Sequence, residues 1–168
     1  LQAVASVRQF NIESNALAKQ LAQDAIALDP EYAMAYIVLS STHRMDVWLG
    51  TSKSPKESIA KNMALIQKAI DLDPTYAEAY GQLGFTYSMI GKHDKAVAKA
   101  EQAVALNPNS AYVHMLLGHT LRFADRFEEA IPEYKKAIRL NPIPPTNYLF
   151  GLGIAYCWAG QNEEAIEW

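Results

Sequence analysis

Apolar residues recur along this chain at steps of three and four, which is the spacing of one face of an α-helix. In residues 74–91 the large members of this pattern include Tyr80, Leu83 and Tyr87, and a glycine closes the segment, which predicts one helix. A second helix is predicted over residues 94–106, before an Asn-Pro pair that ends it because proline cannot donate the next helical hydrogen bond. The pattern therefore favours an all-α chain.

This two-helix pattern returns with a fixed period. A six-residue string ending in proline occurs four times, 44, 34 and 34 residues apart, as AIALDP, AIDLDP, AVALNP and AIRLNP at residues 25–30, 69–74, 103–108 and 137–142. A Leu-Gly pair follows the same register to within one residue, at residues 83–84, 117–118 and 152–153. A two-helix unit cannot cover its own apolar faces, so successive units are expected to stack into a solenoid.

Two glycines occupy matching positions inside the predicted helices. Gly84 and Gly118 each cost about 1 kcal/mol relative to alanine at such positions. We expect a close approach of the paired helix to offset this cost. The small residues Ala96 and Ala130 are predicted to face the two glycines.

The residues that recur at matching positions of these copies resemble the tetratricopeptide repeat family, whose 34-residue pattern places Leu-Gly in the first helix and a closing proline after the second. The second copy matches that pattern with Tyr80, Leu83, Gly84, Tyr87, Ala96, Ala103 and Pro108. The third matches with Leu117, Gly118, Ala130, Tyr134, Ala137 and Pro142, although His114 stands where a large aromatic residue is usual. The first copy departs from the pattern, with Ser40 for glycine, His43 for tyrosine and Asn62 for alanine.

The resemblance implies an all-α, right-handed α-solenoid of antiparallel helix pairs that forms one domain over residues 1–168. The expected divisions are a partial repeat at 1–30, a repeat with an elongated corner at 31–74, repeats at 75–108 and 109–142, and a truncated repeat at 143–168. A weaker resemblance links residues 15–30, 46–58 and 139–148 to repeat regions attached to bacterial class III adenylate or guanylate cyclases and to some winged-helix regulators.

In the family that the chain resembles, the first helices of successive repeats line a concave groove that takes an extended peptide or a partner helix. The resemblance therefore implies a protein-binding groove, lined here by apolar, aromatic and arginine side chains of the kind enriched at interfaces. Each of these side chains has the alternative of packing between repeats. The predicted lining residues are Met34, Ile37, Ser41, Arg44, Met45, Glu78, Gln82, Phe85, Ser88, Met89, Tyr112, Met115, His119, Arg122, Asn147, Phe150, Ile154 and Trp158.

One subtype of groove is not expected. Members of the family that hold a C-terminal carboxylate use lysine, asparagine and arginine at defined groove positions. The corresponding residues here are Ile37, Ser41, Gln82, Tyr112 and Leu116. These side chains cannot assemble a carboxylate clamp.

Charge and composition limit the classes of partner that the chain is expected to bind. The net charge is −3, with acids and bases interspersed, so no basic stripe is present to neutralise phosphates and nucleic acid is not an expected partner. No apolar run approaches the roughly 20 residues that span a bilayer, so no membrane partner is expected. The single cysteine, Cys157, suits a reducing, cytoplasmic compartment. The chain begins without methionine and stops inside a helical pattern, which is expected of a piece of a longer protein.

No catalytic residue, cofactor or metal site is expected. His114 and His119 are five residues apart on one helix, about 140° from each other, which is not the spacing at which two histidines share a metal. Cys157 has no basic neighbour to activate it as a nucleophile and is interpreted as a small apolar residue. Motifs for phosphate binding or acyl transfer are not found, so the chain is not expected to be an enzyme.

Three functions remain open. The leading hypothesis is a protein–protein interaction scaffold, acting as a regulatory part of a larger protein. A second is self-assembly into a homo-oligomer through the uncovered apolar side of an incomplete terminal repeat. A third is a sensor arm of an enzyme whose catalytic domain lies elsewhere in the polypeptide.

The segment at residues 44–58 lengthens one period by ten residues. We expect residues 44–49 to extend the first helix and residues 55–72 to form the second. Ser54 is predicted as the N-cap, Pro55 as the first helical residue and Glu57 as the acid of a capping box. Structural packing is favoured over ligand contact for the apolar residues of this segment, which are Val47, Trp48 and Leu49.

Overall fold

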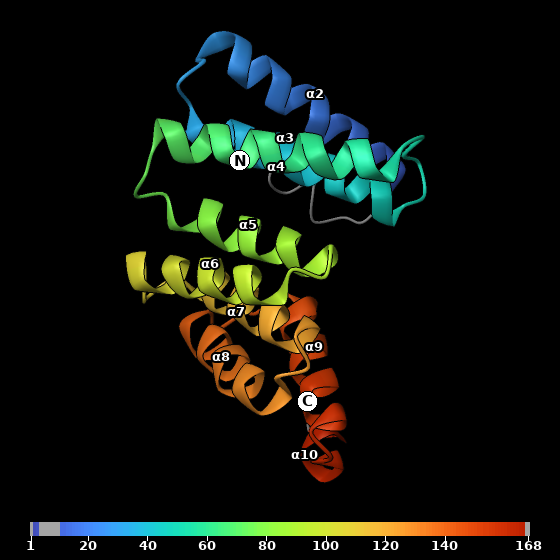
Figure 1. The fold of residues 1–168 in the computed structure, drawn as a ribbon, viewed down its shortest axis with the longest axis vertical. Coiled ribbons are helices and arrows are strands. Elements are labelled where there is room, and N and C mark those ends of the chain that lie inside the picture. Colours follow the sequence, from blue (N-terminus) through green and yellow to red (C-terminus); the bar gives the residue numbers. More distant parts are fainter. Residues whose placement is uncertain (1, 4–10, 167–168) are drawn as a thin grey trace. The chain divides into compact units, whose positions relative to one another are not determined.

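The computed structural model describes residues 2–3 and 11–166. Helices follow one another as α2 (Ile12–Leu28), α3 (Ala33–Trp48), α4 (Pro55–Leu72), α5 (Ala77–Met89), α6 (His93–Leu106), α7 (Ala111–Phe123), α8 (Phe127–Leu140), α9 (Thr146–Trp158) and α10 (Asn162–Ile166) (Figure 1). The described residues contain no strand. The prediction of an all-α fold built from helix pairs is confirmed.

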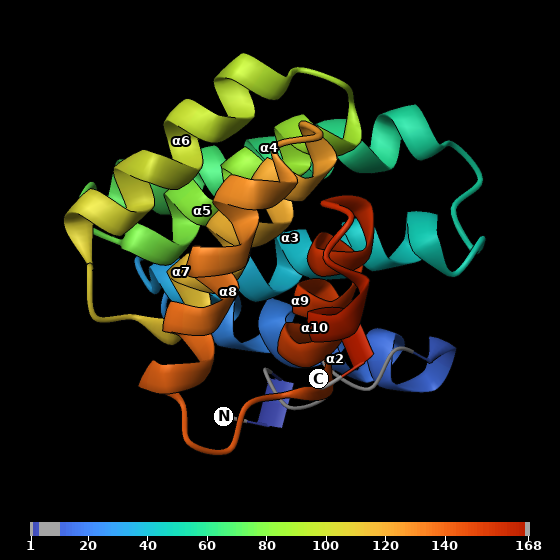
Figure 2. The same ribbon diagram turned by 90° about the horizontal axis from the view of Figure 1, so that it is seen from below.

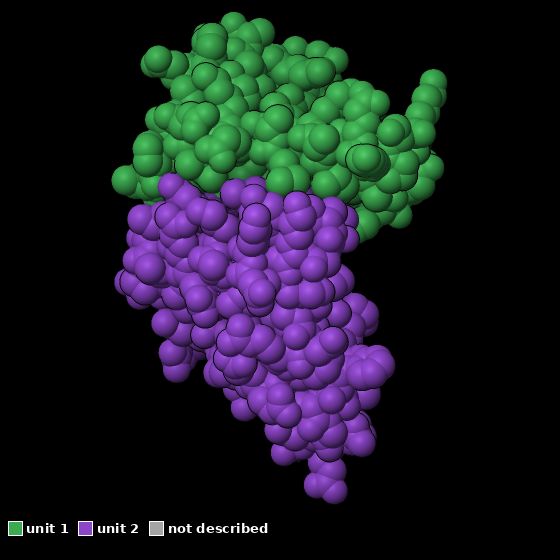
Figure 3. All heavy atoms as spheres, in the orientation of Figure 1, with its two compact units in different colours: residues 1–79 green, residues 80–168 purple. Residues whose placement is uncertain are grey.

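The chain divides into two compact units, Leu1–Ala79 and Tyr80–Trp168, which we call unit 1 and unit 2 (Figure 3). In unit 1, helices α2 and α4 both pack against α3. In unit 2, α7 packs against α6 and α8, while α9 packs against α8 and α10. Figure 2 shows α7 and α8 side by side along their lengths.

Polar side chains join the three helices of unit 1. Asp46 of α3 accepts hydrogen bonds from the Asn15 amide (2.7 Å) and the Lys19 ammonium (2.9 Å), both on α2. Asn62 of α4 is fully buried and donates to the main-chain carbonyl of Ser40 on α3 (2.8 Å). Asn62 stands where the repeat pattern has alanine, so this departure of the first copy is accommodated by a buried hydrogen bond to the main chain of α3.

The long corner between α3 and α4 is held by its own backbone. Gly50 has a φ of +70° just after α3, in a region that glycine enters without steric cost. The Asp46 carbonyl then accepts hydrogen bonds from the amides of Thr51 and Ser52, each at 3.0 Å. Helix α4 runs from Pro55 to Leu72, as predicted, with proline in its first turn.

The predicted capping box at the start of α4 is wrong. The Ser54 side chain makes no capping hydrogen bond. The Glu57 carboxylate, which was expected to reach back to the N-cap, forms an ion pair with Lys61 one turn further along at 2.7 Å. A lysine four residues after a glutamate competes for the same carboxylate, and here that pairing is the one formed.

Gly84 lies where its paired helix comes closest. A Cβ atom on Gly84 would stand 2.7 Å from the carbonyl oxygen of Ala96 and 3.0 Å from the amide nitrogen of Ala100, both on α6. The expected close approach is therefore confirmed at this position, and Ala96 is the facing residue. Only glycine leaves room for the main chain of α6.

Gly118 shows a close approach of a different kind. The nearest atoms to a Cβ atom there are ring carbons of Tyr134 on α8, at 3.0 and 3.1 Å, so the prediction that Ala130 faces this glycine is wrong. Gly151 on α9 meets the same ring, with a Cβ position 2.6 Å from its Cε1. The two glycines thus form the walls of a slot that a tyrosine fills.

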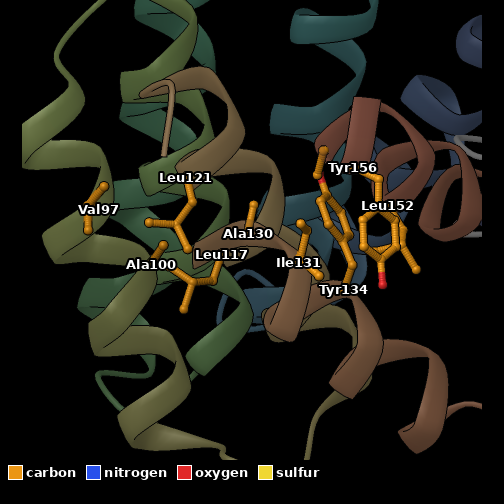
Figure 4. Close-up of a cluster of buried hydrophobic side chains, with 10 residues drawn as sticks. Val97, Ala100, Leu117, Leu121, Ala130, Ile131, Tyr134, Leu152 and Tyr156 are labelled. Carbon is orange, nitrogen blue, oxygen red and sulfur yellow. The ribbon is translucent and has the colours of Figure 1, made fainter. Parts of the chain in front are cut away.

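Tyr134 is the largest fully buried side chain among the described residues. It belongs to a core cluster that draws on four helices of unit 2 (Figure 4). The cluster contains Val97, Ala100, Leu117, Leu121, Ala130, Ile131, Tyr134, Leu152, Ala155 and Tyr156. This core holds α7, α8 and α9 in fixed register and thereby positions the surface described below.

Candidate protein-binding surface

The predicted lining residues differ widely in exposure. In unit 1, Met34 is exposed, Glu78 is partly buried, and four are buried, namely Ile37, Ser41, Arg44 and Met45. In unit 2 four are buried, namely Gln82, Phe85, Ser88 and Met115. Five are partly buried, namely Met89, Tyr112, His119, Arg122 and Ile154. Three are exposed, namely Asn147, Phe150 and Trp158.

In unit 2, hydrogen bonds connect predicted lining residues that lie on the first helices of neighbouring repeats, which are α5, α7 and α9. The Gln82 amide on α5 donates to the Tyr112 hydroxyl on α7. The Asn147 amide on α9 lies 3.8 Å from the Met115 sulfur, again on α7. Side chains from α5, α7 and α9 therefore lie next to one another, so the column alignment identified neighbouring positions in this unit.

An aromatic cluster lies beside these residues. The ring of Phe85 is 5.6 Å from that of His119 and 5.8 Å from that of Phe123, measured between centroids. The His119 Nδ1 atom is 2.6 Å from the hydroxyl of Tyr134. Burial raises the pKa of Tyr134 to about 12, against an opposing effect of the Arg122 charge, so the phenol is protonated at neutral pH and can donate to His119.

A hollow of about 260 Å³ opens in unit 2 where α7, α8 and α9 meet. It is lined by Arg122, Phe123, Asp125, Phe127 and Trp158. The rings of Phe127 and Trp158 stack at 6.0 Å with an interplanar angle of 21°. The Arg122 guanidinium carbon lies 4.7 Å from the centroid of the Phe123 ring, within the range of a cation–π interaction. We call these five residues the ring-lined hollow.

Three residues of this hollow were not predicted. Phe123 occupies the position six residues after the aligned leucine, as Met89 and Trp158 do, so the register alone could have identified it. Phe127 begins a second helix, and a lining drawn from first helices alone had no place for it. Asp125 has a positive φ of 58° at the corner position where the neighbouring copies have Gly91 and Gly160, and a lining drawn from first helices alone did not include this corner.

A smaller hollow of about 190 Å³ lies in unit 1. Its lining is mostly alanine and aliphatic side chains of α2 and α3, together with Gln2, Tyr32 and Met34. Trp48 lies elsewhere in the unit, 42% exposed, with the Arg44 guanidinium carbon 5.4 Å from its ring centroid. That Val47, Trp48 and Leu49 serve structural packing stays a prediction.

Two more histidines, besides His119, have structural partners. His114 is buried, with Nδ1 at 2.5 Å from a Glu133 carboxylate oxygen and Nε2 at 2.9 Å from the Pro108 carbonyl. His43 lies near Asp46, and burial, reinforced by the Lys19 charge, lowers the pKa of its imidazole. Within residues 2–3 and 11–166 no three histidine, cysteine or acidic side chains are grouped so as to hold a metal ion. Over the same residues, no helix combines the length and the apolar character needed to cross a membrane.

The helix pairs, their interior glycines and their repeat period define a helical-repeat protein. Two family models for the tetratricopeptide repeat match residues 65–98, 86–142 and 115–168. These matches together span more than half of the chain, and the chain belongs to the tetratricopeptide repeat family. This fold supports a protein–protein interaction scaffold.

Solved structures with the same fold agree. A thermophilic tetratricopeptide-repeat protein of Thermus thermophilus is 24% identical with a TM-score of 0.68, over 83% of this chain and 72% of that protein. MamA is 28% identical with a TM-score of 0.56, over 89% of this chain and 76% of that one. YrrB, described as having an unusual peptide-binding site, is 19% identical with a TM-score of 0.55, over 92% of this chain and 74% of that protein. Among curated proteins, none matches the chain.

Proposed function

We propose that this chain is a scaffold that binds a peptide or a partner helix through the first helices of its repeats, as a regulatory part of a larger protein. The proposal includes the eighteen predicted lining residues and the repeat divisions expected from the sequence. It assigns no catalytic role and no cofactor to the chain. It also keeps the expectation of a cytoplasmic location, which rests on the single cysteine.

The observation that carries the proposal is a contrast between the exposed residues of α9 and α8. On α9, Phe150 is 68% exposed and Trp158 is 70% exposed. On α8, the exposed side chains are mostly charged, namely Glu128, Glu129, Lys135 and Arg139. Large aromatic side chains left in water on one helix face are typical of a surface that a partner covers.

The size of this aromatic area is sufficient for a useful affinity. An aromatic side chain buries roughly 150–250 Å² when it is fully covered. At about 25 cal/mol per Å², covering the exposed part of Trp158 alone corresponds to about 3 kcal/mol before the costs of association. The peptide-binding description of YrrB, a protein with the same fold, supports the same kind of ligand.

Peptide selection tests the proposal. Random 12-residue peptides displayed on phage are selected on the immobilised chain, and dissociation constants of the enriched peptides are measured by fluorescence anisotropy. We expect the double variant Phe150→Ser/Trp158→Ser to weaken binding at least tenfold, because both aromatic contacts are lost. The matched control Glu128→Gln/Arg139→Gln on α8 should bind within twofold of the unmodified chain.

Two results would argue against the proposal. If no peptide is enriched, or if the aromatic double variant binds as well as the control, the first-helix face is not the binding surface. Sedimentation velocity on the same variants separates the homo-oligomer alternative. Self-association that disappears in Phe150→Ser/Trp158→Ser, together with no enriched peptide, would favour assembly of identical chains.

A further inference from the structure

The ring-lined hollow contains a cation next to three aromatic rings. Arg122 comes from the last turn of α7, Phe127 from the first turn of α8, and Trp158 from the end of α9. All three helices belong to unit 2 and share its core cluster. The hollow is therefore formed by one compact unit, whose shared core holds the three helices together.

Arg122 has no acidic partner. No carboxylate of the residues that the structure describes lies within 4.0 Å of its guanidinium nitrogens. The neighbouring Arg126 is different, since its Nε and an Nη atom bind the two oxygens of Glu129 at 2.7 and 2.6 Å. Arg122 is thus the cation of this corner whose charge is left for a ligand.

The guanidinium of Arg122 is held in place before any ligand arrives. It lies over the ring of Phe123, and its charge acts on the buried Tyr134 hydroxyl. Arginine is only partly exposed here, so a charge placed beside it is less screened than on an open surface. A planar guanidinium held in this way matches the two oxygens of a carboxylate.

Asp125 carries the opposite charge at the rim of the hollow. It is exposed at the corner between α7 and α8, and no side chain of the described region pairs with it within 4.0 Å. An exposed carboxylate on a surface corner interacts weakly with a ligand because water and salt screen it. The partly buried arginine is therefore the stronger determinant of ligand charge.

We propose that the ring-lined hollow receives an acidic residue of the bound peptide, followed or preceded by an aromatic or aliphatic residue. The carboxylate binds the Arg122 guanidinium, and the apolar side chain lies against Phe127 and Trp158. This rests on the proposed function, and it names the chemistry of the partner that the surface selects. None of the five positions at which a carboxylate clamp would be built lines the hollow.

The peptide selection described above tests this chemistry when the enriched sequences are read. Selection on the unmodified chain should enrich Asp or Glu adjacent to Phe, Trp, Leu or Ile. Selection on Arg122→Gln should keep the apolar preference and lose the acidic one. Affinity of the best acidic peptide should fall about tenfold or more in Arg122→Gln, which is the effect of losing a charge-assisted hydrogen-bonded pair.

Arg139→Gln is the matched control, because it removes the same charge from an exposed position near the end of α8 and should leave affinity within twofold. Circular dichroism confirms that each variant keeps its helicity. Enriched peptides without acidic residues, enriched basic residues, or equal affinity for Arg122→Gln and Arg139→Gln would each overturn the inference while leaving peptide binding intact. A failure to enrich any peptide would instead overturn the proposed function.

Discussion

The close approach at Gly84 leads to a prediction that can be tested with one matched pair of variants. In Gly84→Ala, the new methyl group would stand 2.7 Å from the Ala96 carbonyl oxygen and 3.0 Å from the Ala100 nitrogen. In Gly153→Ala, on α9, the nearest atom is the Ala165 carbonyl oxygen at 3.9 Å, which is ordinary contact. The same chemical change, in the interior of two helices, therefore meets very different surroundings.

The two substitutions are expected to change the free energy of unfolding in opposite directions. Replacing glycine by alanine inside a helix contributes about 1 kcal/mol of stability through helix propensity. Overpacking costs about 1–3 kcal/mol, and the upper end applies at Gly84 because the overlapped atoms are main-chain atoms of α6 that cannot rotate away. We expect Gly84→Ala to be destabilised by about 2 kcal/mol and Gly153→Ala to be stabilised by about 0.5–1 kcal/mol.

Thermal unfolding followed by circular dichroism measures this difference. For a chain of this length a change of 1 kcal/mol shifts Tm by about 2–4 °C, so Gly84→Ala should lower Tm by about 4–8 °C and Gly153→Ala should raise it slightly. If both variants raise Tm by similar amounts, α6 does not approach Gly84 as closely as described. If both variants lower Tm, the gain in helix propensity does not stabilise Gly153→Ala, and the reasoning about that variant is refuted.

Three further predictions concern buried polar groups and the backbone. Asn62→Ala should lower the free energy of unfolding, measured by urea denaturation, by about 1–3 kcal/mol, because the buried Ser40 carbonyl loses its side-chain donor. An effect smaller than that of an exposed Asn-to-Ala change would refute this role. Burial lowers the pKa of His43 in the folded chain, so the unfolded chain binds more protons as the pH falls. The stability that depends on neutral His43 is complete above pH 6.5 and is lost as the pH falls through the lowered pKa of the folded state. His43→Gln should therefore flatten Tm between pH 7 and 5, and an unchanged profile would rule His43 out. Because Asp125 has a φ of +58°, Asp125→Ala should be less stable than Asp125→Gly by about 1 kcal/mol, and equal Tm values would contradict this.

Local signals in the sequence predicted the helices well. The second helix of the long corner was expected over residues 55–72 and is found at Pro55–Leu72, and the helix expected over residues 94–106 is found at His93–Leu106. Proline and glycine set these ends through the backbone of the residues involved. Such signals need no knowledge of neighbouring helices.

The errors arose where a side chain chooses between partners. Glu57 had both its N-cap and Lys61 within reach, and a pattern cannot rank them. Gly118 was expected to face Ala130, yet Tyr134, one turn further along α8, fills the space. The residue that faces a given glycine depends on where the two helices cross, which is set by packing of the whole unit.

The candidate surface was predictable only in part. The repeat register places Tyr112 next to Gln82 in unit 2, and the hydrogen bond between them agrees with that placement. The register carries no information about exposure, so it could not separate the buried Met115 from the exposed Trp158. The role of Phe127 needed the structure, because it depends on the meeting of α8 with α9.

The central claim is that the first helices, and not the second, bind the partner. Two-dimensional ¹H–¹⁵N NMR of the labelled chain, titrated with the best selected peptide, tests it directly. The account predicts that the largest shift changes fall on α7, on α9, including the indole signal of Trp158, and at Phe127 where α8 begins, while the exposed faces of α6 and of the rest of α8 change little. Changes concentrated on α6 and α8, with the Trp158 indole signal unmoved, would contradict it.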